Sequence, residues 1–203
     1  MNTISEKSKQ YAIRCHTQTN HLYNGLPYHE AHLQPVVDTG IIFLHLIPEP
    51  DRDNVLGGLW VHDIIEDCRE TWNDVKKETN EEVANLAYAL TNEKGKTRSE
   101  RANSKYYKGI RKTKNATFIK LSDRIANVFF SYQNRNLNKG GMFSKYKSEN
   151  GKFIYELVKP EWYQLWEQTI RLITPEEEFI TYRINIHPYR KMIYHLQDIM
   201  NRM

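Results

Sequence analysis

The sequence has few cysteines and no hydrophobic run long enough to cross a membrane. The longest apolar run, residues 41–47, is interrupted by His45 and ends at Pro48, whereas a membrane helix needs about 20 apolar residues. The first ten residues (MNTISEKSKQ) contain no apolar signal-peptide core. The two cysteines, Cys15 and Cys68, cannot form a disulfide framework and are expected to be free thiols in a reducing compartment. We therefore expect a soluble cytoplasmic protein without a membrane partner.

The sequence also lacks a strong charge imbalance. It has 29 basic and 25 acidic residues, and a net charge of +4 does not by itself indicate a nucleic-acid partner. Hydrophobic residues make up 39% of the chain, which is enough for a core and argues against disorder. A length of 203 residues fits one domain with an extension. We expect a core over residues 1–135 and an extension over 136–203 that packs on it and could mediate a homo-oligomer.

No stretch alternates with period two for long, so the sequence predicts an all-α fold with a mostly helical extension. Capping boxes at Thr3, Thr71 and Thr97 mark three helix starts. Helical spacing of apolar residues predicts helices from residue 3 to the Asn24-Gly25 pair, then over 35–48, 53–67, from 71, 83–90, from 97, and 118–129. Residues 140–151 read as a loop, 162–170 as a helix and 179–186 as a β-rich segment.

The predicted helix over residues 53–67 carries four ionisable groups on one face. At about 100° per residue, His62, Asp63, Glu66 and Asp67 fall within an arc of roughly 140°, and apolar residues fill the opposite arc. Carboxylates on a partly buried face raise each other's pKa unless a cation compensates them. A metal ion is the simplest compensation, although a solvated amphipathic helix would show the same local pattern.

The wider pattern favours the metal. His32 lies upstream in PYHEAHLQPVV, and Asp123 lies downstream in IKLSDRIANV, with Lys120 and Asn127 on the same helical face as Asp123. Two imidazoles and two carboxylates suit a borderline divalent transition metal, with positions left open for water and substrate.

The ordered series His32, His62-Asp63 and Asp123 resembles the ligand set of HD-domain metal-dependent phosphohydrolases. GLPY before the first histidine, VHDIIEDC, TNEK and KLSDRIAN resemble, in particular, the hydrolase domain of Rel and Spo alarmone enzymes and small alarmone hydrolases. The resemblance covers roughly residues 5–130. It implies an HD-domain helical bundle and a cytoplasmic hydrolase that removes the 3′-pyrophosphate of (p)ppGpp, a phosphorylated nucleotide substrate.

The resemblance also implies residue roles. One divalent ion, manganese first and otherwise zinc, iron or nickel, would be held by the four residues of the series. Glu66 and Asp67 would act on the attacking water, and Asn127 would contact the nucleotide. In the family the first histidine follows the tyrosine by three residues, but His32 follows Tyr28 by four, so His29 remains an alternative ligand.

Base recognition departs from the family, which has an arginine before this element to stack on guanine. This chain reads HLYNG there, so Tyr23 is the candidate for base stacking. The stretch from Glu93 to Arg124 contains eleven basic and three acidic residues. Lys94 and Arg101 are its candidates for phosphate contacts, with Arg98 as a further one.

Three alternatives stay open from the sequence. The chain could be another nucleotide or dinucleotide phosphohydrolase, which would release inorganic phosphate rather than pyrophosphate. It could be an inactive module that senses a nucleotide, although both Glu66 and Asp67 are present beside the ligand candidates. A nucleic-acid-binding protein is the least favoured, because there is no Gly-rich loop or stacked-aromatic pattern.

Overall fold

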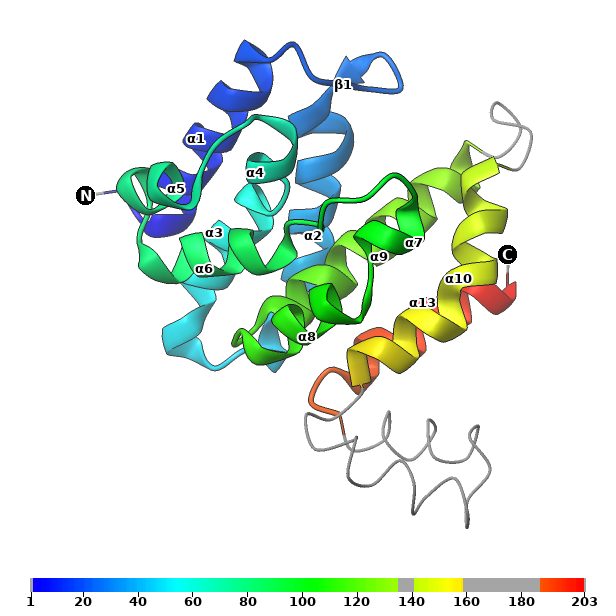
Figure 1. Cartoon of the computed structure of the whole chain (residues 1–203). Coiled ribbons are helices and arrows are strands. Elements are labelled where there is room, and N and C mark those ends of the chain that lie inside the picture. The colour runs from blue at the N-terminus through cyan, green and yellow to red at the C-terminus, as the bar shows by residue number, and fades with distance from the viewer. Residues whose placement is uncertain (1, 135–140, 159–186, 203) are drawn as a thin grey trace. The chain divides into compact units, whose positions relative to one another are not determined.

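The computed structural model describes residues 2–134, 141–158 and 187–202 (Figure 1). The prediction of an all-α fold is confirmed: within the described residues the only sheet is a hairpin of two short strands. No helix in this part of the chain has both the length and the hydropathy needed to cross a membrane. The predicted helix at 162–170 and the β-rich segment at 179–186 lie outside the described residues.

The chain divides into two compact units, Met1–Asn127 and Val128–Met203. The first unit contains the hairpin β1 (Leu22–Tyr23) and β2 (Leu26–Pro27), and the helices α1 (Ile4–Gln18), α2 (Gln34–Phe43), α3 (Arg52–Val61), α4 (Ile64–Asp67), α5 (Trp72–Glu78), α6 (Glu81–Leu90), α7 (Arg98–Arg101) and α8 (Ser104–Lys112). The boundary falls within α9 (Ala116–Gln133). The described part of the second unit also contains α10 (Gly141–Val158) and α13 (Arg190–Arg202), each with a buried apolar stripe.

All three predicted capping boxes are present. The hydroxyls of Thr3, Thr71 and Thr97 accept hydrogen bonds from the backbone N–H three residues later, and the acidic side chain at that position bonds back. Such caps satisfy N–H groups that a helix leaves unpaired at its start. They fix the first residues of α1, α5 and α7.

Two predicted helix boundaries and one loop are wrong. The first helix does not reach Asn24-Gly25: α1 ends at Gln18, and Asn24 and Gly25, with φ of 53° and 81°, form the tight turn of the hairpin. An Asn-Gly pair suits such a turn because both residues tolerate positive φ. Residues 141–151, predicted as a loop, begin α10, where Phe143, Tyr146 and Phe153 are buried. Their helical spacing outweighs the glycines and polar residues.

The third prediction to be corrected is the single helix over residues 53–67. The chain leaves helical hydrogen bonding at His62 and Asp63, so that α3 ends at Val61 and α4 starts at Ile64. The His62 ring contacts the carbonyl oxygen of Leu59 through Nδ1 at 2.9 Å. A side chain that satisfies a carbonyl of the last turn stabilises the end of a helix. The break therefore coincides with a contact that favours the end of α3 at this position.

Helix α3 is the centre of the first unit, where it packs against α1, α2 and α6 (Figure 1). Its two adjacent glycines make this close packing possible. A Cβ added at Gly57 would lie 2.8 Å from Ser8 Oγ of α1, and one added at Gly58 would lie 2.6 Å from Ile119 Cδ1 of α9 and 2.9 Å from Leu86 Cδ1 of α6. This packing holds the end of α3, and with it His62, against α9.

We predict that Gly58→Ala destabilises the protein. The added methyl overpacks the core between α3, α6 and α9, which costs about 1–3 kcal/mol and outweighs the higher helix propensity of alanine. Gly109→Ala is the control, because Gly109 lies in α8 with no atom within 4 Å of an added Cβ. Denaturant unfolding should show a loss for Gly58→Ala and a gain of about 0.5–1 kcal/mol for Gly109→Ala. Equal stability of the two variants would contradict this packing.

Candidate metal centre

The structure brings His32, His62 and Asp123 together from three separate segments. Their nearest ligand atoms all lie within 4.8 Å of one another, and all three residues are buried. The two Nε2 atoms are 3.3 Å apart, and they lie 3.6 and 3.8 Å from Asp123 Oδ1. Ligand atoms about 2.1 Å from a shared ion lie roughly 3–4.2 Å apart. The group could therefore hold a metal ion.

Asp63, the fourth predicted ligand, lies at the same place. Its Oδ2 atom is 3.0 Å from His62 Nε2 and 3.3 Å from His32 Nε2. The Tyr28 hydroxyl donates a hydrogen bond of 2.5 Å to the same oxygen. Burial first, and then the charge of Asp63, raises the pKa of Tyr28 well above its usual value, so the hydroxyl keeps its proton and remains a donor.

His32 faces this group and His29 does not, so the structure separates the two alternative ligands. Residues 29–33 form a π-helical turn ahead of α2. A π-turn accommodates one residue more than an α-helical turn, and in this turn His32 is buried. His29 instead lies beside Glu30, with 3.6 Å between Nε2 and Oε1.

The orientation of His62 is fixed by the contact that ends α3. Because a carbonyl oxygen can only accept, the contact with Leu59 requires a proton on Nδ1. Nε2 then faces His32 and Asp63, where it would give up its own proton on binding a cation. Histidine ligands of metal ions commonly donate their other N–H to a carbonyl or carboxylate, so the donor set fits a bound cation.

The buried carboxylates of this group favour positive charge on the residues around them. Burial acts to lower the pKa of His62, but the nearby Asp63 and Asp123 outweigh it and raise the pKa to about 9. Burial likewise acts to raise the pKa of Asp123, but Lys120 and His62 outweigh it and the pKa is lowered. Lys120 Nζ lies 2.8 Å from Asp123 Oδ2. The carboxylates therefore stay ionised in a buried place.

The two predicted catalytic acids, Glu66 and Asp67, lie on α4 just after the histidine-aspartate pair. The pKa of Asp67 is raised to about 7 by burial and by the neighbouring Asp63 and Glu66. Its Oδ2 atom lies 3.8 Å from His21 Nδ1. Glu66 has a different environment, because Asn92 donates hydrogen bonds to both of its carboxylate oxygens.

Two predicted substrate residues meet beside the centre. The Tyr23 hydroxyl donates to Asn127 Oδ1 at 3.1 Å, and Asn127 Nδ2 in turn donates to Asp123 Oδ1. Tyr23 also lies near the His32 ring, with 5.5 Å between the centroids. The hairpin is thereby tied to α9 at the candidate ligand Asp123.

The residues predicted to contact phosphate do not all lie beside the centre. Arg101 NH1 lies 4.0 Å from Glu66 Oε1, so this arginine is near the acidic pair. Lys94 is exposed in the segment before α7, and no contact between it and the other site residues is seen in the described ranges. Arg98 lies in the first turn of α7.

Sequence reasoning missed several residues around the centre. Tyr28 and Asn92 lie within the GLPY and TNEK motifs, so the motifs pointed to these positions, but the sequence assigned no role to either residue. His16 and His21, taken as residues outside the pattern, stack with Tyr28 at centroid distances of 4.6 and 3.9 Å. Their Nδ1 atoms are 3.0 Å apart, and burial first and then His21 lower the pKa of His16 to about 4.

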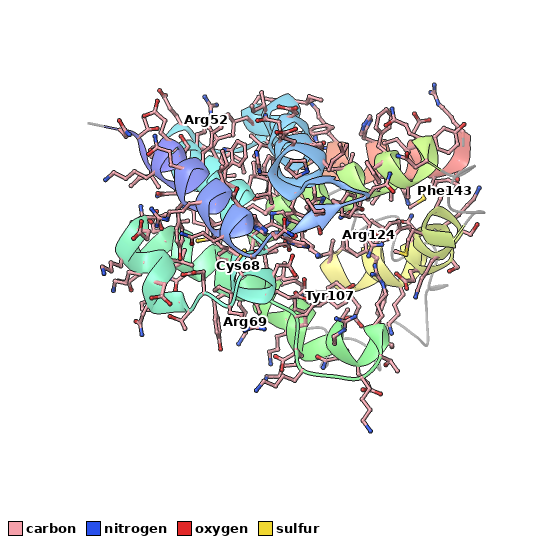
Figure 2. The ribbon with its side chains drawn as sticks, turned by 90° about the horizontal axis from the view of Figure 1, so that it is seen from above. Arg52, Cys68, Arg69, Tyr107, Arg124 and Phe143 are labelled. Atoms are coloured by element: carbon pink, nitrogen blue, oxygen red, sulfur yellow. The ribbon has the colours of Figure 1, made fainter. Side chains whose placement is uncertain are left out.

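Cys68, which directly follows the acidic pair, is a buried free thiol (Figure 2). Its Sγ atom lies 3.9 Å from Thr19 Oγ1, and burial raises its pKa to about 11. A thiol with a raised pKa is a poor nucleophile. The environment of Cys68 therefore favours a role in packing.

No family model matches the chain, and no solved structure matches it. The structural support for a function is therefore the geometry of the centre.

We predict that Tyr28→Phe weakens binding of a divalent ion. The change removes the hydrogen bond that orients Asp63, and loss of such a partner typically lowers metal affinity about 10–100-fold. Calorimetric titration of the chelator-treated protein with Mn²⁺ and with Zn²⁺ measures the effect. Tyr88→Phe is the control, since Tyr88 is exposed on α6. An unchanged affinity in Tyr28→Phe would show that the hydroxyl does not support the centre.

Proposed function

We propose that this chain is an HD-type metal-dependent phosphohydrolase that acts on a phosphorylated nucleotide, with hydrolysis of the 3′-pyrophosphate of (p)ppGpp as its first candidate reaction. The observation that supports the proposal most is the buried group of His32, His62 and Asp123, which could hold a metal ion. Two further acids follow directly on α4. The resemblance of the motifs to alarmone hydrolases supplies the substrate class.

In this proposal His32, His62, Asp63 and Asp123 hold one divalent ion, with Mn²⁺ as the first candidate and Zn²⁺, Fe²⁺ or Ni²⁺ as alternatives. When bound, such an ion polarises a phosphoryl oxygen and makes water more acidic. Lys120 keeps Asp123 ionised, and Tyr28 holds the orientation of Asp63. The protein residues therefore prepare an electron-rich, oriented set of ligands before substrate arrives.

The acidic pair handles the proton of the attacking water. Asp67 has a pKa of about 7, near the range in which a carboxylate exchanges protons at neutral pH. Arg101, whose guanidinium lies next to Glu66, is placed to meet a phosphate group that enters beside α4. Asn127 and Tyr23, which are hydrogen-bonded to each other, would contact the nucleotide part of the substrate.

A second candidate is a phosphohydrolase with weak base selection. Where the alarmone hydrolases have a stacking arginine, Leu22 is half exposed on the hairpin and the hydroxyl of Tyr23 is engaged with Asn127. The missing cation–π contact is worth about 0.5–2 kcal/mol. Such an enzyme would select phosphate arrangement more than base identity.

We predict that His62→Ala removes both metal and activity. The purified protein is analysed for metal and assayed with Mn²⁺ on guanosine and adenosine tetraphosphates, dinucleotides and mononucleotides. Release of pyrophosphate with a preference for guanine above about a thousandfold supports the alarmone reaction, and kcat/KM values within about a hundredfold for the two bases support the second candidate. His45→Ala is the control, because His45 is exposed between α2 and α3. Wild-type metal content in His62→Ala would exclude this metal centre, and a metal-loaded wild type without turnover would exclude the enzyme.

We predict that Glu66→Gln keeps the metal and loses roughly 10²–10⁴ in kcat. The substitution preserves shape but removes a carboxylate that acts on the water or its proton. Metal content, thermal unfolding and kcat are measured together, with Glu82→Gln on the outer face of α6 as the control. Loss of the metal in Glu66→Gln would identify Glu66 as a ligand instead.

A further inference from the structure

The segment between α6 and α7 makes a set of contacts with Glu66 that the proposed chemistry has not used. The side-chain amide of Asn92 donates to Glu66 Oε1 at 3.0 Å and to Oε2 at 2.8 Å. The backbone N–H of Asn92 also donates to Oε2, at 3.4 Å. One residue, 26 positions away in sequence, therefore contacts both oxygens of a single carboxylate. Hydrogen bonds to both oxygens of a carboxylate fix its orientation.

The segment is itself closed into a compact loop. The backbone N–H of Glu93 donates to the carbonyl oxygen of Arg101 at 3.1 Å, which joins its two ends. Lys105 of α8 lies 3.0 Å from the Glu93 carboxylate. Asn92 directly precedes Glu93 and Arg101 ends α7, so this hydrogen bond holds both residues on the side of the loop that faces Glu66. The position of Asn92 therefore does not depend on its own side chain alone.

The two acids of α4 consequently differ in their surroundings. Glu66 is bound by the loop, whereas Asp67 lies 3.8 Å from His21 and beside the Tyr28 hydroxyl. A free glutamate side chain has three rotatable bonds and would sample many positions. The contacts with Asn92 restrict Glu66 to one of them.

We propose that Asn92 is a positioning residue, whose carboxamide holds the carboxylate of Glu66 in the orientation that the phosphohydrolase reaction requires. This inference rests on the proposed function. A role limited to anchoring the loop would instead act through Arg101 on substrate binding. The two roles differ in the kinetic parameter that they change, because misplacement of a reacting group lowers kcat and loss of a uniform binding contact raises KM.

The kinetic experiment compares Asn92→Ala and Asn92→Asp with the wild type on guanosine tetraphosphate with Mn²⁺. We expect unchanged metal content and KM, and a fall in kcat of about 10–100-fold, the scale of a misplaced reacting group. Asn92→Asp should fall further, because it sets a second negative charge against Glu66. Asn85→Ala is the matched control on α6, since the side chain of Asn85 accepts a hydrogen bond from Trp72 of α5 rather than contacting Glu66. A raised KM with wild-type kcat would overturn the positioning role.

A second measurement tests the contact without any turnover. Exchange of the Asn92 side-chain amide protons is followed by nuclear magnetic resonance in the wild type and in Glu66→Ala. We expect slow exchange in the wild type and faster exchange in the variant. Equal exchange in both proteins would show that the contact is absent and overturn the inference. A persistent contact in a metal-loaded protein that hydrolyses no phosphorylated nucleotide would overturn the proposed function, and the positioning role with it.

Discussion

Much of the first unit depends on the need to balance negative charge in a buried place. Asp63 and Asp123 face two imidazoles at 3.0–3.8 Å, with Lys120 as the additional cation. Unpaired carboxylates cannot be buried cheaply. The raised pKa of His62 means that, without an ion, a proton supplies part of the missing positive charge. A divalent cation supplies more, and binding it only in the folded state links occupancy of the centre to folding.

The candidate ligands could be predicted from the sequence, but their local geometry and several of the residues around them could not. His32, His62 and Asp123 were predicted because few residue types bind metals and their order along the chain is distinctive. The break at His62 was missed because a periodicity argument assumes an unbroken helix, whereas the histidine side chain competes for the Leu59 carbonyl. The contact between Asn92 and Glu66 was missed because it joins residues that no local pattern relates.

The fold shows the same division between local and distant causes. Capping boxes were predicted correctly, because each satisfies backbone N–H groups within three residues. The hairpin was missed although its Asn-Gly turn was visible, since the apolar spacing through Leu22 suggested that the helix continued. In α10, the helical spacing of apolar residues indicated the helix that forms, whereas the glycines wrongly indicated a loop. Neither local signal dominates everywhere, and tertiary packing decides between them.

Helix α9 connects the centre to the hairpin and to α8. Asp123 lies between Lys120 and Asn127 on one face of this helix, and both neighbours bond to its carboxylate. Asn127 continues to Tyr23 on the hairpin, and the Lys120 ammonium lies 5.8 Å from the Tyr106 ring in the basic helix α8. A change of charge at Asp123 therefore acts on the contacts with both the hairpin and α8. The centre and its surroundings form one connected set of polar contacts, so a cation bound there would stabilise the hairpin and α8 together.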